Sequence, residues 1–295
     1  MKKETGDLIQ LHFIVFIYGF TAILGRLIYL EAIQLVWYRM IIAFITLGAM
    51  LLILKRPIKV SKINLLKLIG VGFIVAMHWV TFFHAIKIST ISIALGCLAT
   101  TTLFTSILEP IILKRPFSGL EVVIGVLIII GLYIVLQFEP DHFWGIVTGI
   151  TSAFLVALFT VLNKRLISRM HPTTISFYEM GGGFIAVTIY LWATNTFSTG
   201  LTIPTSSDWF YLLLLGVVCT AYAFMASVKV MQSLSAYTVV LTTNLEPLYG
   251  IVMAFIFFGE SERMSSGFYV GTLLILGSVL LYPIIKRRRR RKRIA

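Results

Sequence analysis

Charged residues are scarce in this chain. Asp, Glu, Lys and Arg make up 13% of its 295 residues, whereas 58% of the residues are hydrophobic. Soluble domains carry about 25% charged residues. A soluble fold of this length could not keep so much apolar surface away from water, so the composition excludes an ordinary globular protein and favours a lipid bilayer as the solvent.

Cysteine is also rare. Cys97 and Cys219 are the two cysteines, and each falls within a long apolar run. This number and spacing exclude the disulfide framework of a secreted protein and a cysteine metal site. We interpret both as small core residues, and we predict neither a metal nor a cofactor.

Motifs of chemical catalysis are missing. The sequence has no Walker motif for nucleotide binding, no Gly-x-Ser-x-Gly elbow and no His, Cys or Asp cluster with metal-ligand spacing. A membrane-embedded enzyme or lipid-handling protein stays open as the alternative function, but it would need such groups. A non-transporting membrane scaffold is a third alternative.

The apolar residues gather in ten runs, and a membrane-spanning helix needs about 20 such residues. The runs lie near 10–26, 33–54, 65–87, 90–113, 119–137, 143–164, 172–195, 207–229, 234–258 and 266–285. The connections between them are short and leave no room for a soluble domain. The sequence therefore predicts an all-α integral membrane protein with ten transmembrane helices.

The net charge of +13 could suggest nucleic acid, but its distribution argues for a membrane topology. If the helices alternate in direction, most Lys and Arg residues fall on one side, in the segments 2–3, 55–67, 114–115, 164–169, 229 and 286–293. Acidic residues concentrate on the other side. The positive-inside rule then places both termini in the cytoplasm. We predict that the protein lies in the cell (inner) membrane and crosses it several times. The closing basic run faces anionic lipid headgroups, and no nucleic-acid partner is predicted.

The second half of the chain echoes the first. Phe20–Leu27 returns as Phe159–Leu166, and Thr100–Leu103 returns as Thr242–Leu245. The spacing between counterparts drifts by only a few residues. We divide the chain into a first five-helix repeat at 1–138, a second at 142–286 and a basic cytoplasmic tail at 287–295. Because five is odd, the second repeat enters the membrane from the opposite side, and such inverted repeats are typical of alternating-access transporters.

Several short motifs strengthen this interpretation. The second span contains Arg39-Met40-Ile41-Ile42-Ala43, the ninth ends in Phe257-Phe258-Gly259-Glu260, and the tenth contains Gly267, Gly271 and Gly277. Over roughly 10–285 the chain resembles the EamA family of the drug/metabolite transporter superfamily. The resemblance implies export or exchange of small metabolites through a central cavity lined by helices 1, 3, 4, 6, 8 and 9. The first repeat departs from the pattern, with Lys114-Arg115-Pro116 after its fourth helix, so no function is carried over to that loop.

Polar side chains at membrane depth are costly and usually face a cavity or a partner. We predict eight substrate-binding residues on this ground: His78, Trp79, Thr101, Thr102, Tyr222, Thr243, Asn244 and Glu246. Each has an alternative. The threonines can bond to their own helix, His78 can make an interhelical hydrogen bond, and Tyr222 can simply pack.

Glu246-Pro247 is the sharpest of these features. Pro247 cannot donate a backbone hydrogen bond, so the helix should kink and free the carbonyl of Thr243 beside a carboxylate. Glu246 can bind a cationic amine, carry a proton or pair inside the fold. The similar Glu109-Pro110 breaks the register of the repeat, and we expect Glu109 near the inner interface.

Four residues are predicted to act in gating or structure: Arg39, Asn163, Glu179 and Pro247. Arg39 and Glu179 occupy matching positions, but inverted topology separates them by about 15 Å along the membrane normal at 1.5 Å per residue. We expect each to tie its helix end to local carbonyls or to a headgroup, and Asn163 to lie at an inner vestibule.

The sequence predicts a secondary transporter that exports small metabolites such as amino acids or their analogues through a midplane cavity. Its predicted partners are a small-molecule substrate, the lipid bilayer and, as a coupling ion that the carboxylate allows, protons. Substrate identity and oligomeric state have no signal in the sequence.

Overall fold

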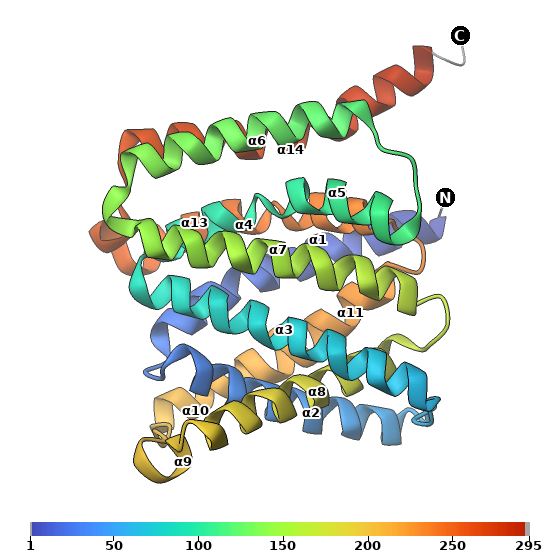
Figure 1. Ribbon diagram of the computed structural model, residues 1–295, viewed down its shortest axis with the longest axis vertical. Coiled ribbons are helices and arrows are strands. Elements are labelled where there is room, and N and C mark those ends of the chain that lie inside the picture. The colour runs from blue at the N-terminus through green and yellow to red at the C-terminus, as the bar shows by residue number, and fades with distance from the viewer. Residues whose placement is uncertain (1, 293–295) are drawn as a thin grey trace.

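The computed structural model describes residues 2–292, and within them every regular element is a helix (Figure 1). The long elements of the first half are α1 (Lys2–Leu27), α2 (Ala32–Ile53), α3 (Lys62–Ile88), α4 (Ile91–Leu98), α5 (Thr101–Leu113) and α6 (Gly119–Phe138). The second half contains α7 (Phe143–Leu166), α8 (Pro172–Ala193), α9 (Thr196–Thr199), α10 (Ser206–Leu213), α11 (Ala223–Val230), α12 (Ala236–Thr243), α13 (Glu246–Phe258) and α14 (Ser266–Lys292). Short η1 (Pro140–His142) and η3 (Gly259–Glu262) are 3-10 turns, and η2 (Leu214–Tyr222) is π-helical.

Each predicted apolar run corresponds to one helix or to consecutive helices, with ends displaced by a few residues. Within the described residues, eight segments are long and apolar enough to cross a membrane, by length and composition. α8 is not one of the eight, and α14 contributes a shorter apolar stretch, Ser266–Ser278. The all-helical membrane fold is confirmed, whereas the count of ten crossings stays a prediction. Residues 293–295 of the predicted basic tail lie outside the described residues.

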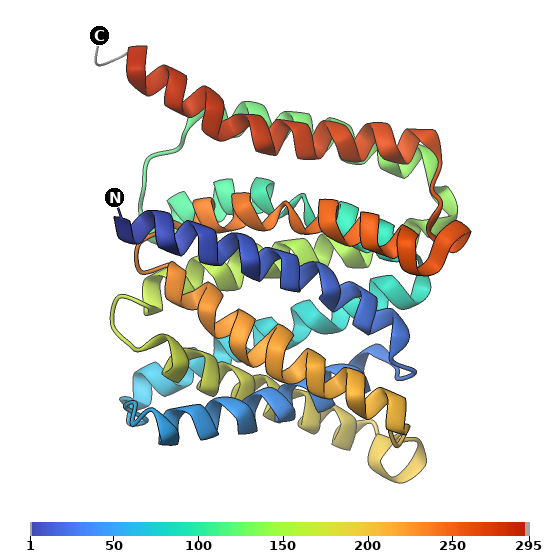
Figure 2. The same cartoon turned by 180° about the vertical axis from the view of Figure 1, so that it is seen from behind.

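The helices lie side by side in stacked rows, with α6 and α14 at one edge of the bundle and α2 and α8 at the other (Figures 1 and 2). Pairs that are distant in sequence pack together: α6 with α14, α2 with α8, α4 with α13 and α5 with α12. Each pair joins the first half to the second. α1 begins and α14 ends on the same side of the bundle (Figure 2).

A close approach of two backbones joins α3 to α8. A Cβ atom added to Gly72 would lie 2.2 Å from the backbone oxygen of Glu179, so only glycine fits at this crossing. The contact fixes α3 against the second half of the molecule. It therefore helps to position His78 and Trp79, which follow on the same helix.

Two of the long helical segments are interrupted near their centres. α12 ends at Thr243 and α13 begins at Glu246, with Pro247 in its first turn. The helix is thus interrupted directly before Pro247, where the sequence predicted a kink. A second break, between α4 and α5, was not predicted. Here the Thr100 hydroxyl donates to the carbonyl of Cys97 at 2.7 Å, and such a local bond competes with the regular helical ladder.

Candidate binding cavity

A cavity of about 850 Å³, its mouth included, lies between the two halves near these breaks. Side chains from α1, α3, α4, α5, α7, α11, α12 and α13 line it, and Arg39 adds a contribution from α2. These are the six spans that the family resemblance implies, with the second span in addition.

Six of the eight predicted substrate-binding residues line this cavity: His78, Trp79, Thr101, Thr243, Asn244 and Glu246. Thr102 does not line the cavity but is buried next to Asn244. It is 1% exposed, and its hydroxyl accepts a hydrogen bond from the side-chain amide of Asn244. Thr102 thus positions Asn244, which reaches across from the other half of the molecule.

Tyr222 does not line the cavity. Its side chain is 37% exposed, at the end of the π-helical stretch η2. The wider turns of this π-helix rotate its side chains away from the positions that a regular α-helix would give them. Phe224 takes the place instead, with its ring centroid 6.0 Å from that of Trp79.

Aromatic rings form one wall of the cavity. Phe224 contacts Trp79 edge to face and lies tilted against Phe159, with the ring centroids of Phe159 and Phe224 5.9 Å apart. His78 joins this wall, 5.6 Å from Phe159. One ring nitrogen of His78, Nδ1, lies 2.7 Å from the hydroxyl of Ser152 on α7. Ser152 was missed from sequence, because a single serine in an apolar run carries no distinct signal.

Arg39 lies at the cavity rather than at a helix end. Its side chain is 1% exposed, its Nε donates to the Thr220 hydroxyl at 2.6 Å, and its Cζ lies 3.8 Å from the ring centroid of Trp79. The expected bonds to local carbonyls or a headgroup are therefore wrong. η2 packs closely on α2 at Gly216 and brings Thr220 within reach, a partner too distant in sequence to foresee.

Asn163 and Glu179 form a buried pair beside the cavity. Asn163 lines the cavity and donates from Nδ2 to Oε2 of Glu179 at 3.2 Å. Glu179 itself is fully buried behind it. The amide oxygen of Asn163 and Oε1 of Glu179 have no hydrogen-bond partner among the described residues. Pro247 also lines the cavity, next to Glu246.

Glu246 is the carboxylate of the cavity. Its side chain is 8% exposed, in the first turn of α13. Of the ion pairs between described residues, none includes Glu246 or Arg39. The cavity therefore combines an aromatic wall, hydroxyl and amide groups, one cation and one carboxylate, and can bind a small amphipathic solute.

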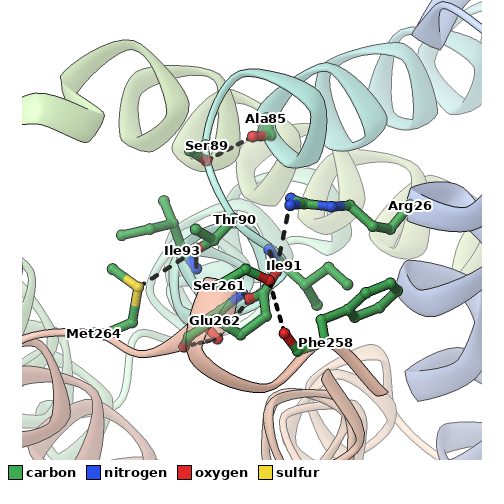
Figure 3. A network of polar contacts seen from close by, with 11 residues as sticks. Arg26, Ala85, Ser89, Thr90, Ile91, Ile93, Phe258, Ser261, Glu262 and Met264 are labelled. Atoms are coloured by element: carbon green, nitrogen blue, oxygen red, sulfur yellow. Dashed lines mark hydrogen bonds and ion pairs between the residues drawn. The ribbon is translucent and has the colours of Figure 1, made fainter. Parts of the chain in front are cut away.

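At one end of the helix bundle, which we call the Glu262 end, a carboxylate of the second half caps a helix of the first. Glu262 accepts hydrogen bonds from the backbone N–H groups of Ile91 and Ser92, at 3.1 and 2.9 Å, and from the Ser92 hydroxyl at 3.0 Å. Figure 3 shows Arg26 reaching toward the same carboxylate from α1, at 3.7 Å. The N-terminus of α4 is thereby fixed to the η3 turn.

At the opposite end, the Glu109 end, the relation is reversed. Glu109 of the first half accepts a hydrogen bond from the backbone N–H of Tyr237, at the N-terminus of α12, at 3.2 Å. It also pairs with Arg115. Glu109 thus lies beside the basic loop, as predicted, and it links that loop to the second half.

A shallower hollow of about 530 Å³ lies near the Glu109 end, among α2, α8 and α11. Arg56, His171 and Lys229 line it. Burial, with the positive charges of Arg56 and Lys229, lowers the pKa of His171. A histidine with a lowered pKa stays neutral down to more acidic pH, so this hollow carries its charge on Arg56 and Lys229.

Known proteins with similar sequences are also transporters by name. The sequence profile of the EamA-like transporter family matches residues 8–137 and 143–283. A protein of Archaeoglobus fulgidus named "Uncharacterized transporter" is 28% identical over 153 residues, which are 52% of this chain and 53% of that protein. "Uncharacterized inner membrane transporter YicL" of Salmonella typhimurium is 29% identical over 150 residues, 50% of this chain and 46% of that protein.

The chain thus matches about half the length of these curated relatives. One solved crystal structure superposes with a TM-score of 0.73 at 12% identity, covering 96% of this chain and 99% of that one. At this identity the likeness shows the fold alone. The family profile, by contrast, covers most of both halves, and the chain therefore belongs to the EamA-like transporter family.

Proposed function

We propose that this multi-pass membrane protein is a secondary transporter that exports small metabolites, such as amino acids or their analogues, by alternating access. The observation that carries the proposal is the cavity between the two halves. It joins an aromatic wall to an amide, several hydroxyls and a carboxylate in the middle of long apolar helices. Such intramembrane polar groups are typical of a substrate pathway.

We take the architecture to be ten crossings in two inverted repeats, 1–138 and 142–286. The packing of α6 on α14, of α2 on α8 and of α4 and α5 on α13 and α12 supports it, because each pair joins equivalent spans. The interrupted centres of the fourth and ninth spans also support it, since broken helices at mid-membrane are common at transporter sites.

The two ends of the helix bundle serve as alternating gates in this mechanism. Each closed end is held by a carboxylate of one half on a helix N-terminus of the other, Glu262 on α4 and Glu109 on α12. Rocking the halves apart at one end breaks one set of bonds while the other set persists. Access can then pass from one side of the membrane to the other.

Both termini are proposed to lie in the cytoplasm, with the protein in the cell (inner) membrane. The basic loops support this orientation, and the printed name of the Salmonella typhimurium relative is an inner membrane transporter. Arg26→Cys and Arg165→Cys, each in a variant lacking Cys97 and Cys219, should react with impermeant maleimides from opposite sides. Reaction from the same side would refute the inverted topology.

Flux into proteoliposomes tests the function directly. Purified protein should accelerate counterflow of at least one labelled metabolite from a panel of amino acids, amines, organic acids and nucleosides. Protein-free vesicles serve as the control. No movement of any panel member would count against the transporter and in favour of the enzyme or lipid-handling alternative.

Proton coupling is proposed to act through Glu246, the carboxylate of the cavity. Glu246→Gln should flatten the pH dependence of flux while the protein stays folded. Glu260→Gln is a matched control, because Glu260 is exposed and pairs only with exposed Arg263 among the described residues. Unchanged pH dependence in Glu246→Gln would remove Glu246 from the proton path.

A further inference from the structure

Arg39 is a buried cation without an anionic partner. Its Nε is bound to Thr220 and its guanidinium covers the Trp79 ring, but its Nη1 is buried and has no hydrogen-bond partner among the described residues. A buried charge is normally paired, because removing it from water is costly. Arg39 lines the cavity, so its unpartnered Nη1 is a donor that an anion bound there can satisfy.

Glu246, in the other half of the molecule, is a carboxylate without a cationic partner in the part of the chain that the structure describes. It lines the same cavity and is 8% exposed, and no ion pair or hydrogen bond of its carboxylate with another described residue is present. No ion pair joins it to Arg39. A single pocket thus contains a guanidinium and a carboxyl group that form no ion pair with each other.

Both charges are held in place by their surroundings. The Thr220 hydroxyl that accepts from Arg39 donates in turn to the carbonyl of Leu215 at 2.7 Å, a contact across the wide turn of η2. Glu246 stands at the first turn of α13, directly before Pro247. Groups fixed before binding lose little freedom when a ligand arrives, which favours affinity.

We infer that Arg39 and Glu246 bind the two charges of a zwitterionic amino acid. The guanidinium donates hydrogen bonds to the carboxylate, for which its planar fork is suited, and the ionised form of Glu246 accepts from the ammonium group. The apolar part of the substrate lies against the aromatic wall that includes Trp79, Phe159 and Phe224. This inference rests on the proposed transport function and defines the substrate class of the same site.

Other classes of solute satisfy the pocket less completely. A simple amine would leave Arg39 unpaired, and a simple anion such as phosphate would leave Glu246 unpaired. A neutral solute would leave both. Only a ligand with both charges neutralises the two groups at once, which is why the zwitterion is favoured.

Thermal unfolding of the full-length protein in detergent tests the inference without any substitution. The probes are the standard L-amino acids, their carboxamides and their N-acetyl derivatives. At least one amino acid should raise the melting temperature, and its carboxamide and N-acetyl forms should bind about tenfold more weakly or worse. If no amino acid stabilises the protein, or if the carboxamide binds as well as the acid, the inference is wrong.

Two substitutions then assign the charges. Arg39→Gln should lose the preference for acid over carboxamide but keep the preference for free amine over N-acetyl. Glu246→Gln should show the opposite pattern. Glu260→Gln should change neither preference. A merely structural role of Arg39 would weaken all probes equally and would refute its assignment.

The role of Arg39 can be tested even if the Arg39→Gln protein does not fold. Arg39→Lys keeps the charge without the fork, so it should retain the preference for the acid at lower affinity. Failure of this inference is also distinct from failure of transport. If the panel of metabolites includes a transported solute but no amino acid binds, the zwitterion assignment alone is refuted.

Discussion

The Glu262 end and the Glu109 end are built on one plan but differ in strength. At each end a carboxylate of one half meets the N-terminus of a helix of the other half, α4 at the Glu262 end and α12 at the Glu109 end. Glu262, whose side chain is fully buried, accepts three hydrogen bonds from α4 and its side chain. Glu109 accepts one backbone hydrogen bond from α12 and pairs with Arg115, which is 47% exposed.

This difference bears on which end opens more readily. Each hydrogen bond contributes about 1 kcal/mol net, whereas an ion pair with an exposed partner contributes about 0–1 kcal/mol. The Glu262 end should therefore be the harder one to open. The comparison also indicates that similar gates need not have equal free energies of opening.

Glu262→Ala should have the largest effect. It removes three buried hydrogen bonds from the N-terminus of α4, and we expect the free energy of unfolding to fall by about 3 kcal/mol. SDS titration measures this change. Labelling of buried Cys97 on α4 by a permeant maleimide, in a Cys219→Ala background, should also become faster. Glu260→Ala is the control. An equal loss of stability there would mean that the capping of α4 by Glu262 does not stabilise this end.

Glu109→Ala should cost about half as much, roughly 1.5 kcal/mol, because it removes one backbone bond and a partly exposed ion pair. The same SDS titration applies. Glu31→Ala is a suitable control, since Glu31 also stands at a helix N-terminus but makes no capping bond. A loss larger than that of Glu262→Ala would reverse the ranking of the two ends.

Ser92→Ala isolates one part of the Glu262 end. The substitution removes the hydroxyl donor but keeps the backbone N–H bond, so we expect a loss of about 1 kcal/mol. In a Glu262→Ala background the same change should be nearly neutral, because its main partner is gone. Equal losses in both backgrounds would mean that the hydroxyl contributes independently of Glu262.

Arg26→Gln should have the smallest effect. The Arg26 side chain is 31% exposed and lies 3.7 Å from Glu262, so solvent screens the pair and we expect about 0.5 kcal/mol. The loss should shrink further at high salt. A loss comparable to that of Glu262→Ala would show that the ion pair, rather than the capping of α4, closes this end.

The positions of the helices could be predicted because the bilayer imposes them. Apolar runs of sufficient length became helices with ends shifted by a few residues, and Pro247 marked the break in the ninth span. The break before Thr101 had no comparable signal. It depends on the hydroxyl of Thr100, and threonine is equally common within unbroken helices.

The candidate site was predictable in part. His78, Trp79, Asn244 and Glu246 could be found because polar groups in apolar runs are exceptional, and all four line the cavity. The place of Arg39 could not be found in this way. Its partner Thr220 is distant in sequence, and the position of that hydroxyl depends on a departure from regular helical periodicity.

The π-helical turn of η2 therefore determines where the hydroxyl of Thr220 lies next to Arg39 at the cavity. The hydroxyl of Thr220 reaches the carbonyl of Leu215 only because the wide turn brings residues five apart together. A chain that lost a single residue here would still cross the membrane, yet it would swing this hydroxyl away from the guanidinium of Arg39. An insertion or deletion in this span should therefore change the cavity through Arg39, without replacing any side chain that lines it.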